Sequence, residues 1–236
     1  MRVLKPRSEF APEGQGLEPV EFYDQLHGDL PEGEHALYRP LNRLVVERLL
    51  ACGSRSILEV GCGRGELASL ILRQVPARYR GFDYSRAGVE NARATTGWSA
   101  LFSIGNALDP NAYAGPDYDT IVCCEVLEHI DRDLDVIKLW KPGTWCICSV
   151  PNFDYAGHVR FFRSEAQVRD RFGHVIDIAS VERVARPVMP HGFDAYLKQL
   201  RWSRNDWRRL LGLLGVNTFE YLSGWFVLCG RRNSIV

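Results

Sequence analysis

The feature that most constrains the fold is a glycine-rich segment between an apolar run and a helical pattern. Residues 57–68 read ILEVGCGRGELA, in which Gly61, Gly63 and Gly65 form G-x-G-x-G. The run ILEVG is typical of a buried strand, and residues 66–74 carry apolar side chains at helical spacing. Glycines at such a junction let the backbone turn tightly and approach a ligand, and the helix that follows offers free amides. The segment therefore predicts a ligand-binding strand–loop–helix unit.

Most of the chain repeats this alternation of apolar strands and helices. Strands are predicted at 57–61, 79–84, 100–107, 118–126 and 144–151, and helices at 21–29, 35–51, 66–74, 86–94 and 131–139. Continuous apolar strands between helices indicate a parallel sheet covered on both faces. Near the C-terminus we expect a helix from Ser203, then strands at 216–222 and 225–232 joined as a hairpin. The expected fold is α/β: a seven-stranded, mostly parallel sheet with an antiparallel last strand, helices on both faces, and an inserted cap.

Composition excludes several classes of protein. Lys+Arg and Asp+Glu are 29 each, so nucleic acid is not the expected partner, because proteins that bind it usually have a basic excess. No apolar stretch approaches the roughly 20 residues of a membrane span, and the N-terminus lacks an apolar signal core. The seven cysteines include no C-x-x-C and lie mostly in apolar runs, which indicates buried free thiols in a reducing, cytoplasmic compartment. The oligomeric state is not indicated.

The glycine loop favours a cationic ligand over a dinucleotide. A dinucleotide fingerprint would place its third glycine where Glu66 stands, and Glu59 before the loop opposes a phosphate. With E-V-G-C-G-R-G at 59–65, the chain resembles the class I methyltransferases, over about residues 36–151 and 203–232. The resemblance implies a Rossmann-like fold whose last strand is antiparallel, S-adenosylmethionine as the cofactor, and methyl transfer as the activity.

Four segments are expected to contact the cofactor: the glycine loop, the ends of the second and third predicted strands, and the end of the fourth. In the family, an acidic residue after the second strand binds the ribose hydroxyls, and Asp83 matches it; alternatively Asp83 caps the next helix. Asn106 stands where relatives often have an aspartate that receives the adenine amino group, and its side-chain carbonyl can also accept that hydrogen bond. The expected cofactor-binding residues are Glu59, Gly61, Cys62, Gly63, Asp83, Tyr84, Asn106, Ala107 and Glu125.

The acceptor is expected to meet the methyl group near two histidines. The enzyme must align the nucleophile with the methyl group, and a hydroxyl acceptor also needs a base, usually histidine. His129 follows the fourth strand, and Tyr155 and His158 follow the fifth, so these three are the expected catalytic residues; a helix-start histidine and a solvated loop are the alternatives. We expect transfer to an oxygen or nitrogen of a small-molecule or glycan-like polar acceptor. The alternatives are a metal-assisted RNA 2′-O-methyltransferase and a non-catalytic S-adenosylmethionine-binding module.

The segment E-V-L-E-H at 125–129 raises the question of a metal. Small-RNA 3′-end 2′-O-methyltransferases and ubiquinone-biosynthesis O-methyltransferases carry E-x-x-E-H with a further histidine, and bind a divalent metal there. That further histidine is absent from the matching context just before Trp202, so no metal is expected. A basic cluster over 198–209 is interpreted as a solvated helix face, with phosphate contact as the alternative.

Residues 152–202 do not follow the alternation of strands and helices. They carry a predicted helix at 164–172 and an extended stretch at 174–188. We interpret them as an acceptor-binding insertion before the last helix; in the alternative register, these two segments are the penultimate helix and strand, and the insertion follows them. The expected domains are an arm over the site at 1–35, the cofactor-binding core at 36–151, the insertion at 152–202, and the last helix and hairpin at 203–236.

Overall fold

The computed structural model describes residues 18–29, 35–155, 157–186 and 223–234, with Leu197, Leu211 and Phe219. The strands are β1 (Ser56–Val60), β2 (Arg78–Asp83), β3 (Phe102–Ile104), β4 (Thr120–Cys124), β5 (Trp145–Pro151), β6 (Ile176–Ala185) and β7 (Gly224–Arg232). The helices are α1 (Val20–Asp29), α2 (His35–Ala51), α3 (Glu66–Gln74), α4 (Arg86–Thr96), α5 (Asp133–Lys138) and α6 (Glu165–Phe172). Short 3₁₀ turns are η1 (Ser99–Leu101), η2 (Pro110–Tyr113) and η3 (Leu127–His129). Among these residues, no helix is long and apolar enough to cross a membrane.

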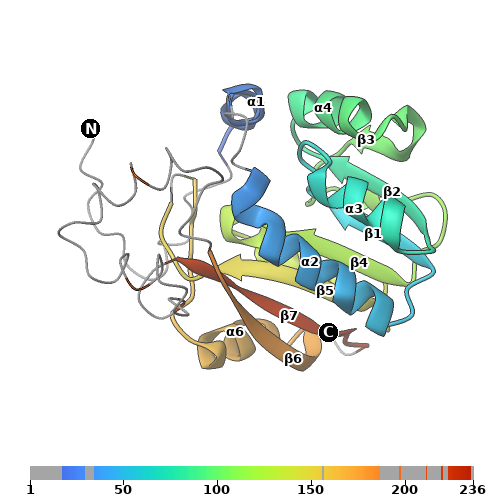
Figure 1. Cartoon of the computed structure of the whole chain (residues 1–236). Helices are drawn as coiled ribbons and strands as arrows, with labels where there is room; N and C mark the ends of the chain where they lie inside the picture. The colour runs from blue at the N-terminus through green and yellow to red at the C-terminus, as the bar shows by residue number, and fades with distance from the viewer. Residues whose placement is uncertain are drawn as a thin grey trace.

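The strands form one sheet in the order β3-β2-β1-β4-β5-β7-β6 (Figure 1). Strands β1 to β5 are parallel to one another, whereas β7 pairs antiparallel with both β5 and β6. Strand β6 therefore runs in the same direction as β1 to β5. This confirms the expected seven-stranded, mostly parallel sheet with an antiparallel last strand.

The preferred placing of the insertion is wrong. The edge strand beside β7 is β6, preceded by α6, so the alternative register holds. Most side chains of β6 are half-buried or exposed, unlike those of the central strands, so its sequence lacks the continuous apolar run of a parallel core strand. Any insertion then follows β6. Residues 187–222 lie outside the described part, apart from Leu197, Leu211 and Phe219. The expected C-terminal helix falls in the same range. The division into domains stays a prediction.

Two apolar cores hold the sheet between its layers. On one face, α2, α3 and α4 contribute buried residues such as Leu41, Ala68 and Val89, which pack with Ile57 of β1. On the other face, α5 and α6 contribute buried apolar residues, which pack with Leu58 and Val60 of β1. This alternation is what a strand covered on both sides requires. All seven cysteines are free thiols, five of them buried, as predicted.

Candidate cofactor and acceptor site

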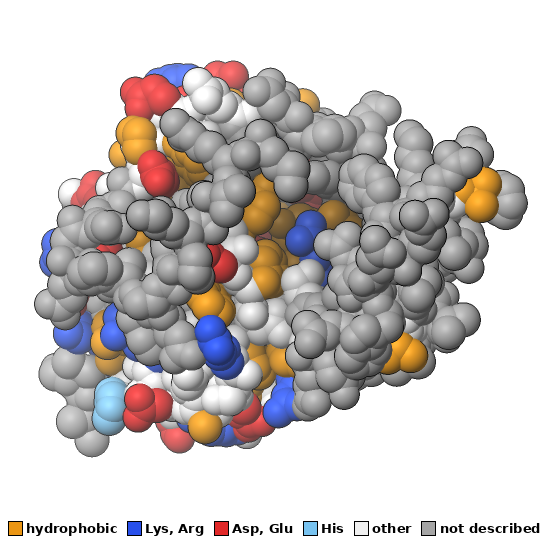
Figure 2. Space-filling model, turned by 90° about the vertical axis from the view of Figure 1, so that its left-hand side faces the viewer, with side chains coloured by type: hydrophobic (Ala, Val, Ile, Leu, Met, Phe, Trp, Pro, Cys, Tyr) orange, Lys and Arg blue, Asp and Glu red, His pale blue; other side chains and the backbone are white. Residues whose placement is uncertain are grey.

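A cavity of about 290 Å³ lies at the carboxyl ends of the parallel strands. In Figure 1 these ends point to the left, and Figure 2 views the molecule from that side, where hydrophobic side chains lie in a recess with basic ones nearby. Ligands of open α/β sheets gather at this edge. All nine expected cofactor residues and the three expected catalytic residues line this one cavity. Their roles stay predictions, but the sequence grouped them correctly.

The glycine loop is shaped by close packing of the protein against itself. Gly61 and Gly65 have φ angles of 75° and 81°. A Cβ atom at Gly61 would lie 2.2 Å from Cγ2 of Val126, and one at Gly65 would lie 2.8 Å from Cα of Ala92. Both positions therefore require glycine because of neighbouring segments as well as because of backbone conformation.

Asp83 joins the loop to the next helix. Its Oδ2 accepts a hydrogen bond from the Gly63 amide and its Oδ1 one from the Ser85 amide, both at 2.8 Å. The N-cap of α4 is Ser85, whose hydroxyl accepts from the Gly88 amide, so Asp83 is not the cap. Asp83 lines the cavity and each carboxylate oxygen has a further lone pair, which fits the expected contact with ribose hydroxyls.

Glu59 and Asn106 are the other polar groups of the cofactor side. Glu59 is 3% exposed and accepts a hydrogen bond from the Tyr79 hydroxyl at 2.5 Å. Burial raises the pKa of Glu59 to about 8, against the opposing effect of that hydrogen bond. Oδ1 of Asn106 accepts from the Leu108 amide at 2.9 Å, which leaves the carbonyl one more lone pair for an adenine amino group. Buried carboxyls in this cavity fit a cationic cofactor better than a phosphate.

Helix α1 closes one side of the cavity. Oδ1 of Asp24 accepts hydrogen bonds from the Ser85 hydroxyl at 2.5 Å and the Ala87 amide at 3.1 Å, which holds α1 to the start of α4. The Tyr23 ring then meets the edges of Tyr84 and His129, with centroids 6.3 and 5.8 Å away. Tyr23 thus lines the cavity from the segment that the sequence predicts as an arm over the site.

Two acidic residues follow β4. Glu125 has a φ of 58°, the only positive value of a non-glycine residue in the described ranges, and its Oε1 accepts from the Ser149 hydroxyl at 3.1 Å. Glu128 is fully buried, and no donor group in the described part of the chain gives a hydrogen bond to either carboxylate oxygen. Burial, the charge of the neighbouring Glu125 and a hydrogen bond shared with that carboxyl raise the pKa of Glu128 well above its ordinary value. Two buried carboxyls side by side require a shared proton or a cation beside them.

His129 and His158 meet although 28 residues separate them. Their ring centroids are 4.8 Å apart. Nδ1 of His129 lies 3.0 Å from the Gly157 carbonyl and Nδ1 of His158 lies 3.2 Å from the Phe153 carbonyl. A carbonyl oxygen can only accept, so each neutral ring carries its proton on Nδ1 and its lone pair on Nε2. The two rings thus have the tautomer suited to a base or a metal ligand.

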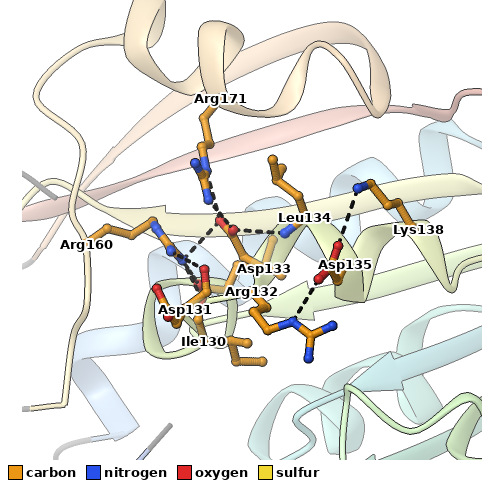
Figure 3. Close-up of polar contacts among 10 residues, drawn as sticks. Ile130, Asp131, Arg132, Asp133, Leu134, Asp135, Lys138, Arg160 and Arg171 are labelled. Atoms are coloured by element: carbon orange, nitrogen blue, oxygen red, sulfur yellow. Dashed lines mark hydrogen bonds and ion pairs between the residues drawn. The ribbon is translucent and has the colours of Figure 1, made fainter. Parts of the chain in front are cut away.

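The buried Arg160 fixes this arrangement (Figure 3). Its guanidinium donates to the carbonyls of Leu127, Ile130 and Asp131. It also lies 3.1 Å from Oδ2 of the fully buried Asp133, whose Oδ1 pairs with Arg171 at 2.6 Å. Through these contacts the segment after β5 is fastened to the turn that carries Glu128 and His129.

Two polar residues that follow β5 have structural roles. Arg160 does not line the cavity, because its guanidinium is taken up by the turn after β4. The side-chain amide of Asn152 donates to the Phe219 carbonyl and accepts from the Gly224 amide, so it anchors the start of β7. Tyr155 does line the cavity and is 51% exposed. Sequence reasoning missed Tyr38, Phe153 and Arg186, which line it from α2 and from the ends of β5 and β6.

Fold, cavity and family comparison define the class of protein. The profile of the family described as "Methyltransferase domain" matches residues 34–206, so the chain belongs to this family. It contains a methyltransferase domain with a Rossmann-like fold, and the family uses S-adenosylmethionine.

Its curated relatives include ubiquinone biosynthesis O-methyltransferases. The enzyme of Vibrio cholerae (strain ATCC 39315 / El Tor Inaba N16961) is 30% identical over 181 residues, covering 72% of this chain and 66% of the relative. That of Thiobacillus denitrificans is 31% identical over 120 residues, covering 48% and 51%. The chain thus spans slightly less than two thirds of the length of the Vibrio cholerae relative and about half of that of the Thiobacillus relative.

Solved structures share the fold. The N-methyltransferase NodS from Bradyrhizobium japonicum, in complex with S-adenosyl-L-homocysteine, has a TM-score of 0.57 at 15% identity, covering 90% of this chain and 97% of that one. Magnesium protoporphyrin IX methyltransferase from Synechocystis, also with S-adenosylhomocysteine, has a TM-score of 0.54 at 17% identity, covering 90% and 94%. At these identities, the likeness concerns the fold alone.

Proposed function

We propose that the protein transfers a methyl group from S-adenosylmethionine to a hydroxyl oxygen of a small polar molecule. The observation that carries this proposal is the pair of histidines beside the cavity, each with its Nδ1 proton directed at a backbone carbonyl. Oxygen is favoured over nitrogen because a hydroxyl needs a base to take its proton, whereas an amine is delivered unprotonated. The O-methyltransferase relatives support the same choice.

The residues of the cavity divide the work. Glu59, Asp83 and Asn106 bind and orient the cofactor, which supplies an electrophilic methyl group when bound. His129 or His158 accepts the hydroxyl proton at Nε2, while its Nδ1–H continues to donate a hydrogen bond to a backbone carbonyl. Holding nucleophile and methyl group in line accounts for most of the acceleration expected of such an enzyme.

The test is methyl transfer to matched acceptors. Purified protein with labelled S-adenosylmethionine is given catechol and 1,2-diaminobenzene, which differ in the nucleophilic atom. Transfer to the hydroxyl compound alone supports the proposal, and transfer to the amine alone refutes it. Cofactor binding without turnover over a broad acceptor panel would favour a non-catalytic module.

A second candidate is metal-assisted O-methylation, favoured by a group of possible ligands. Glu128, His129 and His158 each offer one ligand atom, and these atoms lie within 4.8 Å of one another. The further histidine of the resemblance would stand near Trp202. Here the histidine beside Glu128 and His129 is His158, from the segment after β5. These residues could hold a divalent cation, which would polarise two neighbouring hydroxyls and neutralise the buried Glu128.

Chelation separates the two candidates. Activity that survives EDTA, as the sequence led us to expect, assigns the histidines to proton transfer. Loss of activity that magnesium or manganese restores, together with a bound metal found by elemental analysis, assigns them as ligands. An RNA acceptor would in addition show salt-sensitive binding; the basic cluster that could serve it lies outside the described residues.

A further inference from the structure

Arg186 enters the acceptor side of the cavity from the end of β6. Pro151 at the end of β5 and Val184 near the end of β6 both lie opposite Trp225 of β7. The two strands therefore end level, and Arg186 lies beside Phe153, two residues beyond each of those positions. The guanidinium carbon is 5.6 Å from the centroid of the Phe153 ring.

The backbone on both sides of this contact is fixed. The Arg186 amide donates to the Ser223 carbonyl at 2.9 Å, and the Asn152 amide donates to the Gly224 carbonyl at 3.0 Å. The backbone of Arg186, and that of the residue before Phe153, are thus held at the start of β7. A guanidinium stacked on an aromatic ring keeps its N–H donors directed away from the ring and available in the plane.

Arg186 forms no ion pair within the described residues, although its charge acts on the Glu125 carboxyl and lowers the pKa of that group, against the larger effect of burial. Two arginines line the cavity, and Arg64 lies 3.9 Å from Glu66. No carboxylate in the described ranges lies within ion-pair distance of Arg186; that of Glu125, which faces the same cavity, accepts from Ser149 instead. A half-buried cation beside an aromatic wall is an anion-binding feature.

Strand order separates this cation from the cofactor side. Glu59 is on β1 and Asp83 ends β2, whereas β6 is at the far edge, with β4, β5 and β7 between it and β1. The carboxyls of the cofactor side suit the cationic groups of the cofactor, and Arg186 is separated from β1 by three strands. We propose that Arg186, backed by Phe153, binds an oxyanion of the acceptor, a carboxylate or a phosphate ester. This rests on the proposed function and names the substrate class of the same site.

The experiment compares neutral and anionic acceptors that are otherwise matched. One arm uses 3,4-dihydroxybenzoate and its amide, the other 4-hydroxyphenyl phosphate and hydroquinone. Both the binding affinity for the S-adenosylhomocysteine-loaded protein and kcat/KM for methyl transfer are measured. In at least one arm the anion should be preferred by about tenfold or more, since hydrogen bonds to charged groups are the strong ones.

Two variants test the residue. Arg186→Gln should abolish the preference and leave affinity for S-adenosylhomocysteine unchanged. Arg183→Gln removes the same charge from an exposed position of β6 outside the cavity and should keep the preference. No preference in the wild type in either arm, including binding of neither anion, overturns the proposal, as does an unchanged preference in Arg186→Gln. Anion preference in binding without methyl transfer would instead refute the proposed function alone.

Discussion

Replacing Glu59 with glutamine should stabilise the free protein in alkaline solution. Glu59 is 3% exposed, and burial raises the pKa of its carboxyl from 4.5 to about 8. Between these pH values the folded protein keeps a proton that the unfolded chain has released, so stability falls as pH rises from 4.5 to 8 and is level above. At 1.36 kcal/mol per pKa unit, ionisation lowers the free energy of unfolding by up to about 5 kcal/mol.

Glutamine avoids this cost because it never ionises. Its carbonyl oxygen can still accept the hydrogen bond from the Tyr79 hydroxyl. We expect E59Q to melt about 10 to 20 °C above the wild type at pH 9, and within about 2 °C of it at pH 5. Thermal unfolding by circular dichroism measures this, with Glu47→Gln, an exposed position on α2, as the matched control.

The same substitution should weaken cofactor binding. A cationic cofactor needs the ionised carboxylate, so binding at pH 7 should release nearly one proton, seen by calorimetry as an enthalpy that depends on the buffer. E59Q should remove that release and lower the affinity about 10- to 100-fold, the value of a hydrogen bond to a charged group. Equal melting differences at pH 5 and pH 9, or unchanged proton release in E59Q, would refute the reasoning.

Three further predictions concern the rest of the site. Asp83→Ala should lose about 1–3 kcal/mol of cofactor binding, and unchanged affinity by calorimetry would remove the residue from the site. His129→Ala and His158→Ala are each expected to leave S-adenosylhomocysteine affinity nearly intact, while the one that acts as base depresses kcat by roughly 100-fold or more; wild-type rates in both would point to proximity alone. Arg160→Met leaves Asp133 buried without one partner and should cost about 3–5 kcal/mol in urea unfolding, and a change below 1 kcal/mol would contradict the role of the pair.

Much of the fold followed from local patterns. Helices α2 and α3 begin and end where the periodicity placed them, at His35–Ala51 and Glu66–Gln74. Strand β3 is shorter than the predicted 100–107, because η1 precedes it and the backbone turns at Asn106. Strand β6 was assigned less well, since an edge strand buries too few side chains to give a clear pattern.

The site residues that belong to one continuous segment could be predicted from the sequence. Contacts between two segments that are distant in the sequence could not. The loop around Gly61 and the position of Asp83 follow from a single strand–loop–helix unit. The meeting of His129 with His158 depends on how Arg160 fastens one loop to another, and no spacing rule reveals that. Arg186 was missed because its place in the cavity depends on the direction of β6, which only strand pairing establishes.

The tight packing of Gly61 against Val126 has a consequence for how such an enzyme can diversify. Val126 lies between Glu125 and the η3 turn that carries Glu128 and His129, and no side chain fits between it and the glycine loop. A shift of that turn would therefore press directly on the loop where the cofactor is expected to bind. New acceptors are more readily accommodated by changes after β5 and β6, which leave this contact alone. The cavity thus has one wall in which close packing restricts substitution and another, after β5 and β6, in which the sequence can vary more freely.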